Sequence, residues 1–302
     1  ICPVDDCLLH SDCIHRVYVP AQQRYAFAAV SVKMTDGDML LGRQVQGPTR
    51  YAPELLYPIP RQQGRAELGL TAARLPFCGE DIWHAYELSW LQAGGRPAVW
   101  LGRIHVPANS PNLVESKSLK LYFNSLNNHE FADEHDAVAT IAADLSAAAG
   151  AEVRLQVFSP QDKAFAGVSL PGESLDDEPL SHVGAAGPRC CASGERVEES
   201  LYTHLLRSLC PVTGQPDWAT VWLSYQGQKI DRGSLLSYFL GFRDHQEFHE
   251  QCVERMYMGI HAACQPETLQ VQALYTRRGG LDISPWRSSH PGSAPTHRLN
   301  RQ

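Results

Sequence analysis

Alternation of apolar and polar residues predicts most of the strands in this chain. Two alternating stretches, 82–90 and 98–106, flank the pair Gly94-Gly95, so they predict a hairpin that turns at two glycines. Further runs predict strands at residues 151–159, 219–230 and 269–275.

Apolar residues at helical spacing predict four helices. Residues 129–149 follow this spacing and end at Gly150, a typical helix stop. Residues 233–242 and 245–264 predict two further helices. The stretch 195–209 predicts the fourth, because apolar residues recur in it at every fourth position: Val197, Leu201, Leu205 and Leu209.

A stretch rich in glycine, serine, proline and acidic residues divides the pattern into two halves. This stretch, 160–194, predicts a linker between units at 34–159 and 195–302. Each half combines strands with helices, which predicts an α+β fold of antiparallel sheets with helices packed on one side. The length of 302 residues suits one large domain or two medium ones.

Three segments lack a regular pattern. Residues 1–33 hold three of the nine cysteines, and we interpret them as extraneous or disordered; the alternative is an extension that packs elsewhere. Residues 40–75 are rich in proline and glycine, which predicts an extended arm. The polar residues after Ser288 predict a loose tail.

Composition restricts the class of protein. The formal net charge of -7 disfavours a protein that grips nucleic-acid phosphates. No apolar run approaches the roughly 20 residues that span a bilayer. The nine cysteines are scattered and form no C-x-x-C pair, so no zinc ribbon is expected, and the pattern favours a reduced, cytoplasmic protein.

The loop between residues 208 and 218 carries candidate chemistry. Pro211, Gly214 and Pro216 cannot continue a helix, so the chain curls there and can bring the sulfur of Cys210 to the carboxyl group of Asp217. A nucleophile beside a proton donor suits covalent chemistry on an electrophilic carbon. The plainer interpretation is a small buried cysteine and a turn aspartate.

Several separate motifs give the chain a specific resemblance. They are the 208–218 loop and the runs 57–61, 115–122, 247–252 and 276–283. From about Met34 to Gln302, the chain resembles the NADPH-dependent 7-cyano-7-deazaguanine reductases, the nitrile reductases of queuosine biosynthesis in tRNA modification. The resemblance implies two tandem tunnelling-fold units and a homodimer.

The resemblance also implies the reaction. 7-Cyano-7-deazaguanine is reduced to 7-aminomethyl-7-deazaguanine, and this four-electron step requires two NADPH. Cys210 would form a covalent thioimide with the nitrile carbon, and Asp217 would handle the proton. Because the predicted helix 195–209 ends at Cys210, its dipole would disfavour a thiolate. We therefore expect Asp217 to hold a proton near neutral pH and to deliver it to the nitrile nitrogen.

Binding residues are likewise implied by the resemblance. The substrate would contact Val114, Glu115, Ser116, Phe248, His249 and Glu250, with Glu115 accepting the two N–H donors of the base. His249 would also act near the nitrile. NADPH would contact Ser116, Lys117, Arg278 and Gly279, whose cations and flexible glycine suit phosphates. No metal is expected, since the H-E-x-x-H order is missing.

Plainer interpretations stand beside these roles. We interpret residues 112–122 as a strand, where Glu115 and Lys117 share one face and a cross-strand ion pair would explain Glu115. His249 on an apolar helix face is usually a core histidine, and Arg278 can belong to a solvated turn. Rival functions are a cysteine-dependent nitrile hydrolase, which would not consume NADPH, and a purine- or pterin-binding protein without chemistry, which would form no adduct.

Overall fold

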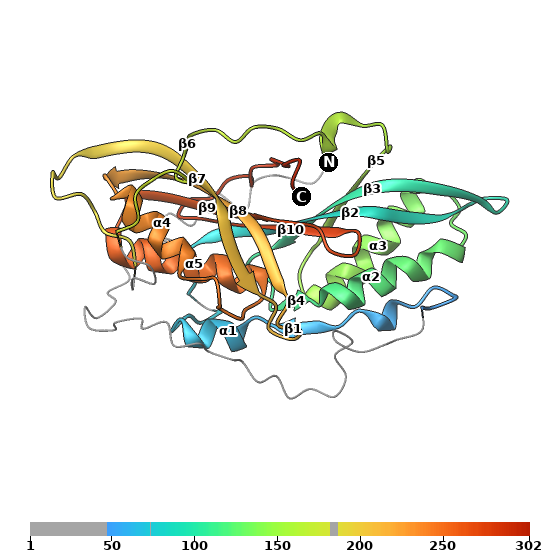
Figure 1. The fold of residues 1–302 in the computed structure, drawn as a ribbon. Coiled ribbons are helices and arrows are strands. Elements are labelled where there is room, and N and C mark those ends of the chain that lie inside the picture. Colours follow the sequence, from blue (N-terminus) through green and yellow to red (C-terminus); the bar gives the residue numbers. More distant parts are fainter. Residues whose placement is uncertain (1–46, 73, 182–186) are drawn as a thin grey trace.

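The computed structural model describes residues 47–72, 74–181 and 187–302 (Figure 1). The α-helices are α1 (Gln62–Glu67), α2 (Ser116–Ser125), α3 (Glu134–Ala149), α4 (Arg232–Leu240) and α5 (His249–Cys264). The strands are β1 (Pro58–Pro60), β2 (Cys78–Gln92), β3 (Arg96–Pro107), β4 (Asn112–Val114), β5 (Arg154–Phe158), β6 (Glu173–Ser174), β7 (Arg196–Leu209), β8 (Pro216–Gln228), β9 (Thr268–Tyr275) and β10 (Leu281–Ser288). Short 3-10 turns lie at Pro53–Leu55, Leu126–Asn128 and Lys163–Phe165.

One eight-stranded sheet organises the described residues. Its order is β5-β3-β2-β10-β9-β8-β7-β6, and every pair except β6–β7 is antiparallel. The helices α2 to α5 lie on one side of this sheet in Figure 1. Each half of the chain contributes a long hairpin followed by two helices and further strand, which confirms the predicted α+β class and agrees with two tandem tunnelling-fold units. The predicted domain boundaries and linker stay predictions.

The central strand β10 was absent from the sequence prediction. It pairs with β2 along its whole length, from Leu281 opposite Ala85 to Ser288 opposite Cys78, and so joins the two halves. Pro285 interrupts the strand pattern, because proline has no N–H for a ladder. The ladder to β9 covers only Trp286–Ser288, so Pro285 precedes it and removes no bond from it.

Both faces of the sheet are covered. The main apolar core packs α2 to α5 against the sheet, with buried residues such as Leu119, Ile141 and Val253. The opposite face meets the end of the chain, where Ala294 packs on Trp286 and Leu299 packs with Trp222 and Leu274. The prediction of a loose tail after Ser288 is therefore wrong.

The helix predicted over 195–209 is also wrong, because this segment is strand β7. It pairs with β8 along its length, and a bulge between Thr203 and Leu206 shifts the register. A step of four residues returns to the same face of a strand as well as of a helix, so the spacing of the leucines could not separate the two. The bulge leaves Leu205 exposed at 38% while Leu206 is buried.

The strand predicted over 112–122 is wrong after Val114. The chain enters helix α2 at Ser116, and Glu115 is its N-cap: the carboxylate accepts hydrogen bonds from the backbone N–H groups of Lys117 and Ser118. The first turn of a helix has N–H groups without intrahelical partners, and this side chain satisfies two of them. Glu115 is therefore a helix cap, and no cross-strand ion pair forms.

The remaining predicted strands and helices are confirmed with shifted ends, but the arm predicted as extended over 40–75 contains helix α1. The hairpin β2–β3 and helix α3, which Gly150 ends in a left-handed conformation, agree with the sequence. Helix α5 begins at His249 rather than at residue 245. The prediction for residues 1–33 lies outside the described residues. Among those described, no helix has the length and apolar character needed to cross a membrane.

Candidate active site

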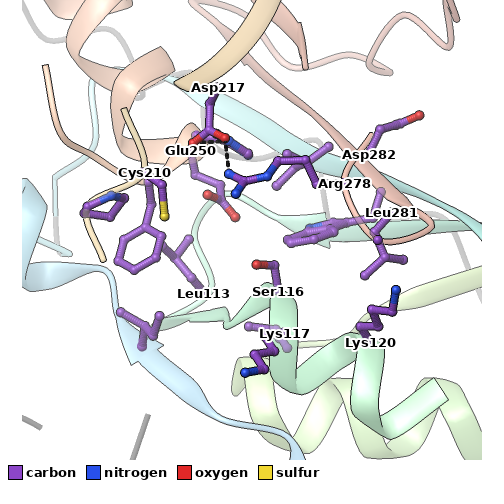
Figure 2. Close-up of a pocket in the computed structure, with 18 of the residues that line it drawn as sticks. Leu113, Ser116, Lys117, Lys120, Cys210, Asp217, Glu250, Arg278, Leu281 and Asp282 are labelled. Atoms are coloured by element: carbon purple, nitrogen blue, oxygen red, sulfur yellow. Dashed lines mark hydrogen bonds and ion pairs between the residues drawn. The ribbon is translucent and has the colours of Figure 1, made fainter. Parts of the chain in front are cut away.

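A cavity of about 300 Å³ lies where the two halves meet (Figure 2). Its wall comes from β4 and the start of α2, the loop after β7, the start of α5 and the turn between β9 and β10. Every site residue predicted from the sequence lines this cavity except Glu115. The structure therefore brings together residues that are up to 165 positions apart in the chain, from Val114 to Gly279.

Cys210 is fixed by its own hairpin loop. Its N–H donates to the carbonyl of Gln215 at 2.9 Å, and its carbonyl accepts from Gly214 at 2.9 Å. Gly214 has a φ of +65°, a conformation that favours glycine. The side chain is buried, with 6% of the residue exposed, and it lines the cavity. The proline and glycine residues of the sequence thus build the predicted curl.

The unfavourable helix dipole predicted at Cys210 is not found, and the start of α5 lines the cavity instead. Cys210 follows strand β7, so no helix ends there. The N–H of Leu209 donates to the carbonyl of His245 at 2.8 Å, which ties the loop to the residues just before α5. Phe248, His249 and Glu250 begin α5 and line the cavity. A helix start carries partial positive charge, which favours an anion in the cavity.

Asp217 lies between two basic side chains. Its carboxylate accepts from Arg278 Nη1 at 2.5 Å and lies 3.2 Å from His249 Nε2, and only 4% of the residue is exposed (Figure 2). Burial raises the pKa of Asp217, but the hydrogen bonds and charges of His249 and Arg278 outweigh burial and lower it. The prediction that Asp217 holds a proton near neutral pH is therefore wrong for this state.

His249 is held by stacking. Its ring lies on the ring of Tyr275 with centroids 3.9 Å apart and planes inclined by 20°. This contact leaves Nε2 directed at Asp217 while 23% of the histidine side chain is exposed. His249 is therefore packed on Tyr275, as the interpretation of a core histidine implies, and it also lines the cavity.

Glu250 differs from Asp217 and Glu247, the two other carboxylates described for this part of the cavity. It is 5% exposed, and burial together with the charge of Asp81 raises its pKa to about 7, against the opposing charges of Arg61 and His249. The neighbouring Glu247 forms ion pairs with His245 and Arg255, which lower its pKa despite burial. Glu250 is thus the buried acid that lies in the cavity wall with a nearly neutral pKa.

Glu115 lies behind the wall that Val114, Ser116 and Lys117 form. It is 1% exposed, and burial raises its pKa although the N–H groups of Lys117 and Ser118 oppose the rise. Because both carboxylate oxygens already accept a backbone hydrogen bond, its observed contribution is to hold the start of α2 in place.

Basic groups gather at the turn between β9 and β10. Gly279 and Gly280 have φ of +62° and +81°, which suits a two-residue hairpin turn, and this turn directs Arg278 toward Asp217. A side chain at Gly279 would meet Lys120 Nζ at 2.9 Å. Lys117 and Lys120 lie one helical turn apart on α2 and both line the cavity.

Sequence reasoning missed several wall residues: Lys120, Trp83, Leu281, Asp282 and Ile283. The spacing of Lys120 from Lys117 could have indicated it once α2 was recognised as a helix. The others required the pairing of β2 with β10. In the part of the chain that the structure describes, no group of three or more His, Cys, Asp or Glu side chains could hold a metal ion.

Comparisons with known proteins match both halves of the chain. Residues 48–157 match the family described as the N-terminal part of the nitrile reductase 7-cyano-7-deazaguanine reductase, and residues 216–293 match the family of QueF-like proteins. A protein of Dechloromonas aromatica is 52% identical over 259 residues, which is 84% of this chain and 92% of that protein. A protein of Stenotrophomonas maltophilia strain K279a is 50% identical over 275 residues, 89% of this chain and 99% of that protein. A Chromohalobacter salexigens protein is 50% identical over 266 residues, 87% of this chain and 96% of that protein, and all three are named NADPH-dependent 7-cyano-7-deazaguanine reductase.

Proposed function

Because the chain belongs to the family of NADPH-dependent 7-cyano-7-deazaguanine reductases, we propose that it reduces the nitrile of 7-cyano-7-deazaguanine to the amine of 7-aminomethyl-7-deazaguanine in queuosine biosynthesis. One observation of the structure carries the proposal. Cys210, Asp217 and His249 line the same cavity as Glu250 and Arg278, so a thiol, an acid–histidine pair, a further carboxyl group and a guanidinium group face one space.

The base would be oriented by Glu250. A carboxylate accepts two parallel hydrogen bonds, which the ring N–H and the exocyclic amine of a deazaguanine supply. Phe248, next to Glu250 in the wall, offers an apolar ring to the heterocycle. Val114 and Ser116 would close the opposite side, and Glu115 would support them through the cap of α2.

Cys210 would form the covalent intermediate. Its Sγ bonds to the nitrile carbon, one C–N π bond breaks, and the nitrogen takes the thiol's proton, which gives the thioimide. Asp217 and His249 are placed to carry this proton, because they share a hydrogen bond and both face the cavity with Cys210. The start of α5 would stabilise negative charge on the sulfur before attack.

The rim of the cavity fits the phosphates of NADPH. Lys117, Lys120 and Arg278 supply charge, and Gly279 permits a close approach of the backbone. Bound NADPH would supply a hydride to the thioimide carbon and, after Cys210 leaves, a second NADPH would supply one to the imine carbon. Two protons complete the amine.

Arg278 would then have two partners. It holds Asp217 in the structure described, and a phosphate at the rim would compete for its guanidinium group. Withdrawal of Arg278 removes a charge that lowers the pKa of Asp217. Asp217 would thus accept a proton more readily once the phosphate is bound, which restores the proton-carrying role that its ion pair otherwise prevents.

We also propose the homodimer that the family resemblance implies. Strands β5 and β6 are the edges of the eight-stranded sheet, and an open edge is where a second copy can extend a sheet. Light scattering after gel filtration measures the assembly directly, and a monomeric mass at micromolar concentration would contradict the dimer.

The proposed reaction is tested by adding 7-cyano-7-deazaguanine to the protein with NADPH and analysing the product. We expect two NADPH to be oxidised for each amine formed, and Cys210→Ala to abolish both turnover and the covalent adduct seen by mass spectrometry. A carboxylic acid product without NADPH oxidation would indicate the rival hydrolase. Binding without adduct or turnover would indicate the rival binding protein.

A further inference from the structure

A chain of buried charges runs behind the cavity, outside its wall. Asp81 on β2 binds Arg61 Nη2 at 2.5 Å and Arg287 Nη1 at 2.8 Å. Arg287 continues to Glu254 on α5 at 2.8 Å, and Glu254 binds Arg65 at 2.7 Å. Each of these side chains is at most 2% exposed. The charges connect the proline-rich arm, β2, β10 and α5 to one another.

The charge balance of this group points to Glu250. Three guanidinium groups and two carboxylates leave one positive charge, which an ionised Glu250, one helical turn before Glu254, would neutralise. Among the described residues, Arg61 Nη1 is buried without a hydrogen-bond partner. A buried N–H group without a partner destabilises the fold, so a negative charge near Arg61 would be favourable.

We propose that Arg61 and Asp81 are positioning residues that set the charge of Glu250, and thereby the pH range in which the cavity accepts a base with paired N–H donors. This inference rests on the proposed function. Neither residue lines the cavity, so both would act through Glu250. Arg61 favours the ionised carboxylate and Asp81 disfavours it, because like charges repel and opposite charges attract in a buried site.

Charged groups other than Arg61 and Asp81 also face Glu250, but most of them lie in the cavity wall. His249 precedes it on α5 and favours ionisation. Across the cavity lie carboxylates of β8 and β10 and cations of α2 and the β9–β10 turn: Asp217, Asp282, Lys117, Lys120 and Arg278. These groups also face the substrate, so changing them would alter binding directly. Arg61 and Asp81 offer a change of charge without a change in the cavity wall.

The inference predicts shifts of opposite sign. Only ionised Glu250 accepts both donors of the base, so affinity should fall about tenfold per pH unit below its pKa. We call the fall of affinity on the acid side of this pKa the acid limb. Arg61→Gln should move the acid limb to higher pH by about one unit, and Asp81→Asn should move it to lower pH by a similar amount. Arg61→Lys should restore the parental limb because it retains the charge. A purely structural role would weaken binding at all pH values in both variants.

The test is calorimetric titration of 7-cyano-7-deazaguanine into Cys210→Ala protein from pH 5.5 to 8.5, with each substitution added to that background. Arg65→Gln is the matched control: it removes one charge from the same network at Glu254, but it should move the limb less than Arg61→Gln does, because the charges that act on Glu250 are those of Asp81, Arg61 and His249. Opposite shifts support the inference; shifts in the same direction, or none, overturn it. If Arg61→Gln does not fold, the other two variants provide the test. A downward shift in Asp81→Asn together with the parental limb in Arg61→Lys supports the inference, and any other result overturns it. Absence of binding by the parent at every pH would instead refute the proposed function, and this inference with it.

Discussion

Replacement of Glu250 by glutamine should stabilise the fold while it damages binding. The folded protein raises the pKa of Glu250 from its ordinary 4.5 to about 7. Between these values the native state binds more protons than the unfolded state, so stability falls as pH rises. The pKa difference of about 2.5 units sets an upper limit of about 3 kcal/mol for the loss at pH 8, since one unit corresponds to about 1.4 kcal/mol.

Glutamine cannot ionise, so Glu250→Gln avoids this loss. We expect the variant to match the parent near pH 4.5 and to become more stable than it as pH rises to 8. Urea unfolding at both pH values measures the difference. The amide also presents an N–H group to the donors of the base, and the mismatch should weaken substrate binding by about 1–3 kcal/mol, or roughly 10- to 100-fold.

Glu247→Gln provides the control with the opposite sign. Although burial raises the pKa of Glu247, His245 and Arg255 lower it, so its charge stabilises the fold at neutral pH and this contribution is lost on acidification. The variant should therefore be less stable than the parent at pH 8. A gain for Glu250→Gln that is equal at pH 4.5 and pH 8 would refute the reasoning, because it would not come from ionisation.

Three further predictions follow from the site and the tail. Arg278→Ala should weaken NADPH binding by about 10- to 100-fold. It should also raise the pKa of Asp217 in the free protein and so move the pH profile of kcat/KM upward, whereas kcat at saturating NADPH should shift less, because a bound phosphate already draws Arg278 away from Asp217. Steady-state kinetics with NADPH and NADH across pH test both effects, and Arg278→Lys should recover part of each. Glu115→Ala should destabilise the protein by about 1 kcal/mol in urea unfolding, whereas Glu115→Asp, which can still cap α2, should lose less; equal stability of the two variants would contradict the capping role. Leu299→Ala should cost about 2 kcal/mol, since this residue is buried against the sheet; an unchanged unfolding midpoint would mean that the tail does not pack.

The sequence was sufficient for the local parts of the site and insufficient for its environment. Pro211, Gly214 and Pro216 determine a curl within a few residues, so the loop of Cys210 could be predicted. The charge state of Asp217 could not, because its partners His249 and Arg278 lie 32 and 61 positions away and act through tertiary contacts. Features set by residues close together in the sequence could therefore be predicted, and features set by contacts between distant residues could not.

Ambiguous patterns explain the errors in the fold. Steps of four apolar residues fit a helix and a strand alike, and only the pairing of β7 with β8 resolves the choice. Pro285 conceals β10 because proline rarely lies within a central sheet. The cap at Glu115 was visible in principle, since an acidic residue that starts a run with helical spacing at Leu119, Tyr122 and Phe123 is a helix-start signal.

The position of β10 imposes an order on the synthesis of the protein. Among the described residues, β10 comes after all the other strands in the sequence, yet it lies between β2 and β9 in the middle of the sheet. While a ribosome adds residues one at a time, β2 and β9 each keep an unpaired edge until residues 281–288 emerge. Leu281, Asp282 and Ile283 also complete the cavity wall, so the nascent chain has no finished cavity before that point. A nonsense mutation upstream of β10 would leave two exposed strand edges, and the truncated chain would be a target for aggregation or chaperones.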